Sequence, residues 1–565
     1  MKKYFPLFWV FYLLCAFSAH AGEGRYTIPL TGGGWSLWLD KEASWQNDRL
    51  YLPHEITDLS LLPVNVPTGG WQTLSHNPDA VPVEVPGTVE EYLTVTDNPR
   101  PENFRGVSWW YRKITIPADE QKKRFIIYFE SVRMRAEVYL DGKLVAYDLI
   151  GETPFHVDIT DEAKPGKEQL LAIRVTNPGG NFHWQDFDIM KWGEYNIPPS
   201  RSFTGIIGRV KLESVNPVFI SDIYMQNTPE LTKVNAILSF TNETSSSVKQ
   251  DVELIVNEKV NPDKVVFRQT LKAISFPAGN HEVTIPVNVP DAKLWDLSTP
   301  ELYTCNVLIK KGKKTLDQDK KDFGFRWFTV DGVGKDAVLR LNGRRIMLRS
   351  AISWGYFPVT GLIATTEMAE KQVRTAKSLG LNMLNFHRCI GSPVVLEKAD
   401  ELGLLYYEEP GSFHSANHDP FIRTIVNEKL KRMVYRDRSH PSLVIFNLIN
   451  EFGGPLSQDK ALVAKRMNDM REAHAIDPSR IMSFTSGWAG SEDKEEDSKA
   501  HMLPFDTTLY RKGWYDNHRA GGPETWVENY YKGPKDNIMY TSNRTEVYLR
   551  GEEGAISTPP RIQMI

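Results

Sequence analysis

The stretch from Ser442 to Glu451 holds the residues of this chain with the clearest chemical meaning. Ser442–Phe446 is apolar and β-branched at its centre, and Asn450 and Glu451 follow shortly after it. Such a run is typical of a buried parallel strand of an α/β barrel, and these barrels keep their catalytic groups at the carboxyl ends of their strands. Glu451 is therefore a candidate acid or base, and the chemistry of a carboxylate pair requires a second such group.

In the segments around this stretch, the spacing of apolar residues alternates between the period of a helix and that of a strand. Amphipathic helices are expected over 367–379, 393–402, 421–436 and 461–475, and strands over 381–386, 404–407 and 442–448. Gly380 and Gly403 end the first two helices. Strands that alternate with helices indicate a parallel sheet, and this many units predict a (β/α)8 TIM barrel over 328–565.

The part of the chain that precedes the barrel shows strand periodicity. Between residues 22 and 217, strands at 124–129 and 136–140 are followed by Asp141-Gly142, a hairpin signal, so a jelly-roll-like β-sandwich is expected. Between 218 and 327 the alternating runs 234–240, 250–256 and 281–287 predict an immunoglobulin-like β-sandwich. The chain is thus expected to be multidomain, with two β units and one α/β unit.

Composition and charge narrow the class of partner. The net charge of −4, with no basic stripe, argues against nucleic acid as a partner. The 15 Trp residues suit stacking on sugar rings and equally suit a hydrophobic core, so both interpretations stay open.

The first 21 residues are typical of a secretory signal peptide. Two lysines precede an apolar run, and Ala19-His20-Ala21 matches a cleavage site, while the run is too short for a membrane span. The protein is therefore expected to be exported, to the periplasm or the medium, without a membrane span. Cys305 and Cys389 are the cysteines of the mature chain; we expect two separate thiols, and no Cys or His spacing indicates a metal site.

Several motifs together resemble glycoside hydrolase family 2, which includes β-galactosidases, β-glucuronidases and β-mannosidases. Residues 85–89, 109–113, 136–142 and 204–208 are similar to the sugar-binding sandwich of that family. Residues 323–326 and 341–350 resemble the start of its catalytic barrel, and 436–451 resemble its acid/base signature. The resemblance covers nearly the whole mature chain.

The resemblance implies a retaining mechanism with two carboxylates. Such a mechanism needs the two carboxyl groups about 5–5.5 Å apart, one as acid/base and one as nucleophile. Glu451 matches the acid/base, and Asn450 would hydrogen-bond the sugar 2-hydroxyl. Glu552 fits the nucleophile pattern better than Glu553, which would be a rim or salt-bridged residue.

Further residues are expected on the substrate side of the site. Where the family carries Asn-x-x-Arg-x-x-His, this chain has Asn385 and Arg388 in place of the Arg and the His, so His387 and Arg388 either face the pocket or His387 is a core residue. A loop with Asp516 and His518, and Trp488 nearby, resembles a substrate-side segment of the family and equally suits a solvated loop. Glu408-Glu409 follows the strand at 404–407 and either lines the same barrel mouth or is an ordinary rim pair, and we favour the rim pair.

These features predict a retaining β-glycosidase acting on a carbohydrate substrate, with β-galactoside favoured as the commonest activity of the family. No cofactor is required, and a homo-oligomer is compatible with the chain. The chain ends shortly after Glu552, so the barrel is expected to be incomplete and C-terminally truncated. The alternative is a catalytically inactive carbohydrate-binding remnant; a purely structural β-protein would not explain two carboxylates at strand ends.

Overall fold

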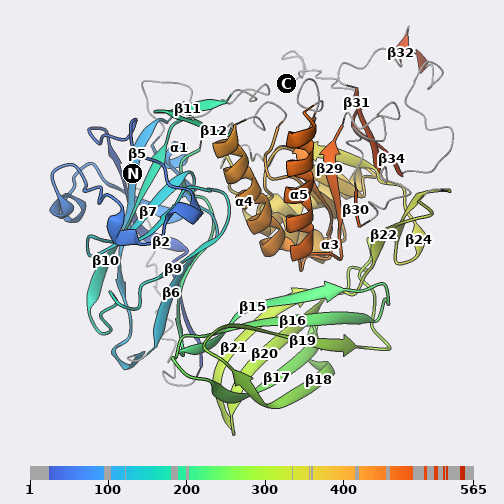
Figure 1. Ribbon diagram of the computed structural model, residues 1–565, viewed down its shortest axis with the longest axis horizontal. Helices are drawn as coiled ribbons and strands as arrows, with labels where there is room; N and C mark the ends of the chain where they lie inside the picture. Colours follow the sequence, from blue (N-terminus) through green and yellow to red (C-terminus); the bar gives the residue numbers. More distant parts are fainter. Residues whose placement is uncertain are drawn as a thin grey trace, which may run out of the picture.

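The chain folds into two β-sandwiches and an α/β barrel domain. The computed structural model describes residues 24–93, 104–120, 123–179, 189–198, 203–333, 335–355, 357, 361–413, 419–452, 459–487 and 502–504, together with the backbone of four strands between 514 and 553. Figure 1 shows the first sandwich beside the barrel and the second sandwich below it. This arrangement confirms the predicted fold class.

The first sandwich pairs a six-stranded with a four-stranded antiparallel sheet. The six-stranded sheet has the order β3-β2-β5-β10-β7-β8, with β2 at Gly32–Asp40, β3 at Val81–Val85, β5 at Gly106–Thr115, β7 at Arg135–Leu140, β8 at Lys143–Asp148 and β10 at Glu168–Asn177. The other sheet has the order β1-β14-β6-β9, with β1 at Tyr26–Pro29, β6 at Arg124–Phe129, β9 at Phe155–Asp158 and β14 at Val210–Val215. Asp141 and Gly142 form the predicted hairpin turn, both with positive φ.

Smaller elements complete the first sandwich. The short strand β4 (Gly87–Thr88) pairs with β13 (Gly205–Ile206), α1 spans Val89–Tyr92, and β11 (Met190–Trp192) forms a hairpin with β12 (Tyr195–Ile197). This hairpin reaches the barrel, because Asn196 Nδ2 donates to Asp419 Oδ2 at 2.5 Å and the rings of Tyr195 and Phe421 lie 4.9 Å apart.

The second sandwich has seven strands. One sheet has the order β15-β16-β19, with bounds Val218–Asn227, Lys233–Asn242 and Gly279–Asn288. The other has the order β18-β17-β20-β21, with bounds Asn261–Phe276, Val248–Glu258, Tyr303–Lys311 and Lys314–Phe323. Alternate residues of β16 are buried, as expected for a strand with one face on a core. Cys305 lies in this core and Cys389 in the barrel, and neither is joined in a disulfide, which confirms the prediction of separate cysteines.

A three-stranded sheet leads into the barrel domain. It consists of β22 (Phe328–Asp331), β23 (Val338–Leu341) and β24 (Arg344–Arg345). Below the barrel, the buried Arg326 donates from Nε to Pro441 O at 3.1 Å and from Nη2 to Leu443 O at 2.8 Å. Arg326 therefore ties the second sandwich to the start of the strand that carries the candidate acid.

The barrel domain is built on parallel strands with helices between them. Its sheet runs β25-β26-β27-β28-β29, all parallel, with an antiparallel β30 at the edge. The strands span Ser350–Ser353, Met383–Phe386, Leu405–Glu408, Leu443–Asn450, Ile481–Ser486 and Met502–Leu503, and the helices α2 to α5 span Thr366–Ser378, Pro393–Leu402, Pro420–Asp437 and Lys460–Ile476. Four further strands follow, β31 (Trp514–Arg519), β32 (Trp526–Val527), β33 (Tyr530–Tyr531) and β34 (Val547–Glu553), of which β31 and β34 pair in parallel.

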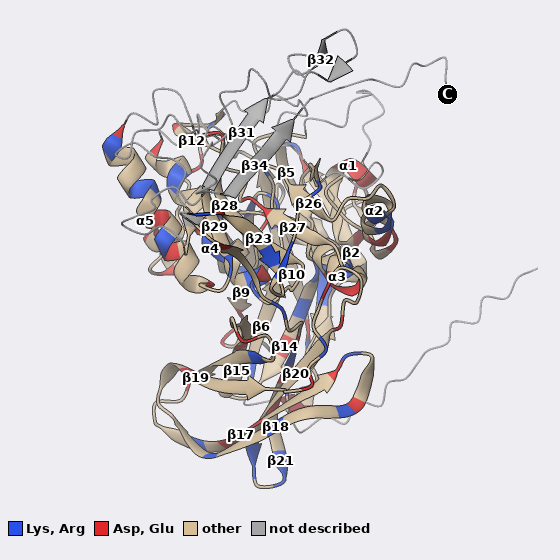
Figure 2. Ribbon diagram, turned by 90° about the vertical axis from the view of Figure 1, so that its right-hand side faces the viewer, with Lys and Arg blue, Asp and Glu red and all other residues tan. Residues whose placement is uncertain are grey.

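Helix boundaries follow from capping residues in the sequence. The Asp419 carboxylate accepts from the backbone N–H of Phe421 at 2.8 Å, and Pro420 occupies the first turn of α4. At the end of α3, Gly403 adopts φ 74°, a conformation that glycine enters without a Cβ clash. Within the described residues, no helix is both long and apolar enough to cross a membrane. Acidic and basic residues are interspersed over the ribbon in Figure 2, in keeping with the small net charge.

Candidate active site

The candidate acid Glu451 lies where β28 leaves the barrel sheet. All eight residues of β28 are buried, since helices cover one face of the sheet and the barrel core covers the other. Glu451 then turns into the left-handed region with φ 52°, a conformation that costs a non-glycine residue about 1–2 kcal/mol. Its backbone N–H donates to Ser486 O at 2.8 Å. The turn brings Glu451 out of the buried ladder to a partly exposed position at the carboxyl end of the strand.

Asn450 is fully buried and held from two sides. Its backbone N–H donates to Ser412 O at 2.9 Å, and Ser486 Oγ lies 2.7 Å from its side-chain Oδ1. The same Ser486 Oγ lies 3.0 Å from Glu409 Oε1. A hydroxyl has one proton, so Ser486 serves one of these two acceptors at a time and couples Asn450 to Glu409. Asn450 Nδ2 is buried and has no partner among the described residues, which leaves a donor for a ligand oxygen.

The pair Glu408-Glu409 lies beneath the site, and the prediction of a rim pair was wrong. Both residues have an exposed fraction of 0%. Glu409 Oε2 accepts from the backbone N–H of Arg388 at 3.0 Å, and Glu408 Oε1 accepts from that of Gly391 at 2.7 Å. Burial raises the pKa of Glu408 well above its usual range, and the nearby carboxylate of Asp437 acts in the same direction. The pair therefore fixes the loop that follows β26 from below.

His387 and Arg388 form one arrangement at the end of β26. Arg388 Nε donates to His387 Nε2 at 3.1 Å, so Nε2 carries no proton in this arrangement. The His387 ring is buried and packs edge-on against Trp354, with centroids 4.7 Å apart. The Arg388 guanidinium lies 4.9 Å from the Trp354 centroid and 4.5 Å from that of Phe413. The structure thus makes His387 a buried partner and Arg388 the partly exposed cation of the pair.

The first sandwich borders the same region. A cavity of about 80 Å³ lies between the two domains, lined by Arg388 and Phe413 on the barrel side and by Glu130 and Arg133 on the sandwich side. Lys429 of α4 pairs there with Glu152 at 2.8 Å. Residues far apart in the sequence therefore share one boundary of the site.

The remaining candidate residues are described by their backbone or lie outside the described residues. Glu552 and Glu553 close strand β34, and His518 of β31 stands opposite Glu552 in the parallel register. Asp516 belongs to the same strand, which runs close to β29. Trp488 lies outside the described residues. Among those described, no group of three or more His, Cys, Asp or Glu side chains is arranged to hold a metal ion.

Four residues of the site were not predicted from the sequence. They are Trp354, Ser412, Phe413 and Ser486, which contact Asn450, Glu451, His387 or Arg388. Ser486 carries a usable signal, since it closes the strand that follows β28 and polar residues at barrel strand ends face the mouth. The other three lie in loops whose partners are set by the fold.

Three models of one family match this chain. They are the sugar binding domain of glycosyl hydrolases family 2 at residues 33–196, the family 2 domain at 218–326 and the family 2 TIM barrel domain at 335–540. A β-galactosidase of Thermoanaerobacterium thermosulfurigenes is 30% identical over 63% of the chain and 48% of its own length. A β-glucuronidase of Formosa agariphila is 24% identical over 61% of the chain and 36% of its own length.

Solved structures of low identity share the fold. A family 2 member from Bacteroides cellulosilyticus has a TM-score of 0.64 at 20% identity, over 81% of this chain and 57% of that one. A β-glucuronidase from Bacteroides uniformis has a TM-score of 0.63 at 20% identity, over 81% and 52%. The chain spans 56%, 36% and 48% of the length of the first three curated relatives that it matches. Since the three family models together match most of its residues, the chain belongs to glycosyl hydrolases family 2.

Proposed function

We propose that this protein is a retaining β-glycosidase that uses Glu451 as acid/base and Glu552 as nucleophile. One observation carries the proposal: the left-handed turn at Glu451 presents a carboxyl group beside a buried, anchored Asn450 at the carboxyl end of a barrel strand. Family membership supports the same assignment. Acid/base chemistry on an acetal needs no cofactor.

The reaction proceeds in two steps with balanced proton transfers. Glu451 gives its proton to the glycosidic oxygen while the Glu552 carboxylate attacks the anomeric carbon, so the aglycone leaves as an alcohol and a glycosyl ester forms. Glu451, now a carboxylate, takes a proton from water, whose oxygen displaces Glu552 and restores both groups. Asn450 Nδ2 would donate to the sugar 2-hydroxyl, an interaction that strengthens as the anomeric carbon becomes cationic.

The substrate we favour is a terminal β-galactoside, and a β-uronide is the second candidate. The galactoside accords with the 30% identical relative, a β-galactosidase. The uronide is favoured by one feature of the site, the partly exposed Arg388 guanidinium, because this group pairs with carboxylates. A β-glucuronidase is also among the curated relatives.

The test compares leaving groups in carboxamide variants. In Glu451→Gln, hydrolysis of an alkyl β-glycoside should fall by about 10²–10⁴, the usual contribution of a general acid, while a dinitrophenyl glycoside should form its glycosyl ester at nearly the parental rate. Glu552→Gln should lose turnover of both. The matched control is Glu370→Gln, a surface residue of α2 paired with Arg374, which should keep parental rates.

The assay uses nitrophenyl β-galactoside and β-glucuronide in parallel, with proton NMR of the first product anomer. A first product of inverted configuration, or parental activity in either active-site variant, would overturn the proposal. Sugar binding without hydrolysis by the parent would favour the non-catalytic alternative. We further infer export through the N-terminal segment, which cell fractionation would test. Light scattering would test whether the chain forms the homo-oligomer with which its sequence is compatible.

A further inference from the structure

The first sandwich carries a cavity of about 520 Å³ that is separate from the barrel mouth. It lies where the end of β2, the start of β5 and the β11 hairpin meet, and its lining includes Asp40, Trp45, Gln46, Phe104, Arg105 and Lys191. Gln46, Arg105 and Lys191 are exposed, so the cavity opens to solvent. Its volume falls in the range of roughly 300–1,000 Å³ that is usual for small-molecule sites.

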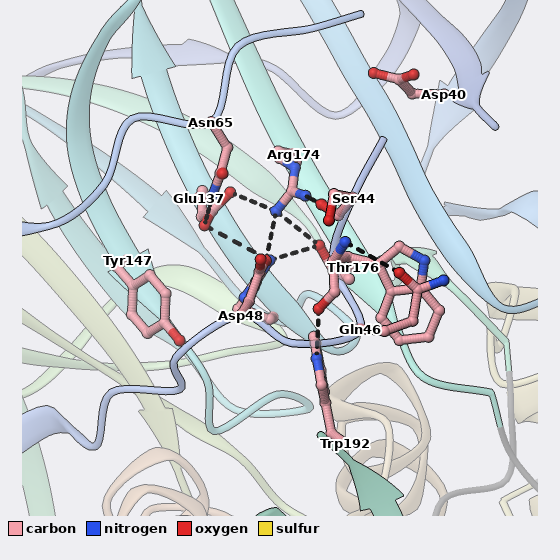
Figure 3. Close-up of polar contacts among 12 residues, drawn as sticks. Asp40, Ser44, Gln46, Asp48, Asn65, Glu137, Tyr147, Arg174, Thr176 and Trp192 are labelled. Atoms are coloured by element: carbon pink, nitrogen blue, oxygen red, sulfur yellow. Dashed lines mark hydrogen bonds and ion pairs between the residues drawn. The ribbon is translucent and has the colours of Figure 1, made fainter. Parts of the chain in front are cut away.

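One wall of the cavity is the segment 41–48, and buried arginines anchor it. Arg174 Nη2 donates to Ser44 O at 3.0 Å (Figure 3). Arg135 Nη2 pairs with Asp48 Oδ2 at 2.5 Å. Arg174 also pairs with Glu137 at 3.0 Å. These side chains are almost wholly buried, so the segment is fixed by charge-assisted hydrogen bonds before any ligand arrives.

The indole of Trp192 supports the same wall from below. Its Nε1 donates to Trp45 O at 2.9 Å, and its ring lies edge-on to that of Trp45 with centroids 5.7 Å apart. The Arg135 guanidinium lies 5.0 Å from the Trp192 ring centroid. Trp45 is thereby held in one orientation and half exposed at the cavity, and a fixed aromatic surface lowers the entropy cost of binding.

The lining combines apolar ring surface with hydrogen-bonding groups. Trp45 and the half-buried Phe104 supply aromatic surface, while Gln46 supplies an amide. Asp40 forms part of the floor with an exposed fraction of 2%; its Oδ2 accepts from Trp109 Nε1 and Thr68 N, and its Oδ1 has no partner among the described residues. Rings for C–H faces and polar groups for hydroxyls are what a pyranose requires.

Charge at the cavity favours an acidic ligand. Among the described residues that line it, Lys41, Arg105 and Lys191 are cationic and Asp40 is the one carboxylate. Arg105 lies along Gly179, where a Cβ atom would come within 2.5 Å of its Nε, so a glycine is needed for this position of the guanidinium. These three cations, in a pocket that also holds aromatic rings, attract an anionic group through charge-assisted hydrogen bonds.

We propose that this cavity is a second saccharide-binding site, which takes a sugar unit that bears a carboxylate or sulfate group. The site does not take part in bond cleavage. The adjacent β12 contacts the N-terminus of α4 through Asn196 and Asp419, on the side of the barrel where the strands end (Figure 1). A glycan held in the cavity therefore lies on the face of the molecule that bears the barrel mouth.

The test measures binding in the Glu451→Gln protein, in which hydrolysis does not consume the probe. Native affinity electrophoresis in 0.15 M salt would use polygalacturonate, alginate and a sulfated galactan, with neutral galactan as the comparison. Arg105→Ala and Trp45→Ala should each weaken retention about tenfold, as expected for one lost charge-assisted contact. The control is Lys113→Ala, a surface lysine of β5 paired with Glu168, which should bind like the parent.

Each outcome decides the proposal. Retention by at least one acidic polysaccharide that Arg105→Ala and Trp45→Ala reduce, and Lys113→Ala does not, supports it; carboxylated and sulfated probes distinguish the two anionic groups. It is overturned if no acidic probe is retained, if galactan is retained equally, or if Arg105→Ala leaves retention unchanged. The proposed catalytic function fails separately, through the hydrolysis assay, because Glu451 does not line this cavity.

Discussion

Two serines of strand β29 offer a matched test of how Asn450 is positioned. Ser486 Oγ lies 2.7 Å from Asn450 Oδ1, and Ser483 Oγ donates to Asn447 Oδ1 at 2.8 Å. All four residues are buried, and each serine pairs with its asparagine across the same two strands. The Ser486 pair stands at the end of the strand and the Ser483 pair three residues before it, and Ser486 Oγ also lies 3.0 Å from Glu409 Oε1.

The expected free-energy changes follow from this geometry. Either Ser→Ala change removes one buried hydrogen bond and leaves an acceptor unpaired, which should lower the free energy of unfolding by roughly 1–3 kcal/mol in both variants. Only Ser486→Ala also releases Asn450, the side chain that we propose to donate to the sugar 2-hydroxyl. Misplacement of such a group by about 1 Å costs up to roughly 10²-fold, so we expect kcat/KM to fall about 10–100-fold for Ser486→Ala and less than about twofold for Ser483→Ala.

The assay combines thermal unfolding with steady-state kinetics on the nitrophenyl glycoside that the parent hydrolyses fastest. Comparable losses in unfolding temperature with a loss of kcat/KM confined to Ser486→Ala would agree with a positioning role. A 2-deoxy substrate should reduce the difference between parent and Ser486→Ala, because it lacks the hydroxyl that we propose Asn450 to bind. Parental kinetics in Ser486→Ala, or an equal kinetic loss in Ser483→Ala, would refute this reasoning.

Three further predictions concern stability. Burial raises the pKa of Glu90 from 4.5 to about 7, so the folded state holds this proton more tightly than the unfolded state does. The folded state therefore loses stability as the pH rises from 4.5 to about 7. Glu90→Gln should have a higher unfolding temperature than the parent at pH 8 and the same unfolding temperature at pH 4.5. Arg480→Ala removes the buried hydrogen bonds to Leu443 O and His440 O and takes the cation away from the buried Asp477 carboxylate. It should cost about 3–5 kcal/mol, against less than about 0.5 for the surface Arg374→Ala, both read from urea unfolding. Gly391→Ala would place Cβ 2.1 Å from the Phe386 ring and should lower the unfolding temperature and the activity together, whereas Gly343→Ala, with open space but a positive φ, should affect unfolding alone.

Local sequence signals predicted the barrel elements well. The helix expected over 393–402 spans Pro393–Leu402, and the helix expected over 421–436 spans Pro420–Asp437. The strand expected over 442–448 extends two residues further, to Asn450. These elements were predictable because apolar periodicity, proline at the first turn and glycine at the end act over a few neighbouring residues.

Contacts between strands were not predictable in the same way. Glu409 and Ser486 stand 77 positions apart in the sequence, and their contact depends on the parallel order of β27, β28 and β29. The sequence pattern of two adjacent glutamates indicates a solvated pair, because isolated charges are rarely buried. Burial of both is tolerated since backbone N–H groups of Arg388 and Gly391 donate to them.

By itself, the sequence determined the class of this protein and the identity of its candidate acid, because the strand–Asn–Glu pattern is local and its motifs follow one another along the chain. Only the tertiary structure decided how that acid is presented. Asn450 is oriented by a serine from the next strand, and Arg388 by a carboxylate from the strand on the other side. Contacts between side chains of paired strands are not visible in the local periodicity of the sequence, because that periodicity reflects only which residues of one helix or strand face the core. The cavity of the first sandwich has the same origin, because its wall depends on arginines from two other strands.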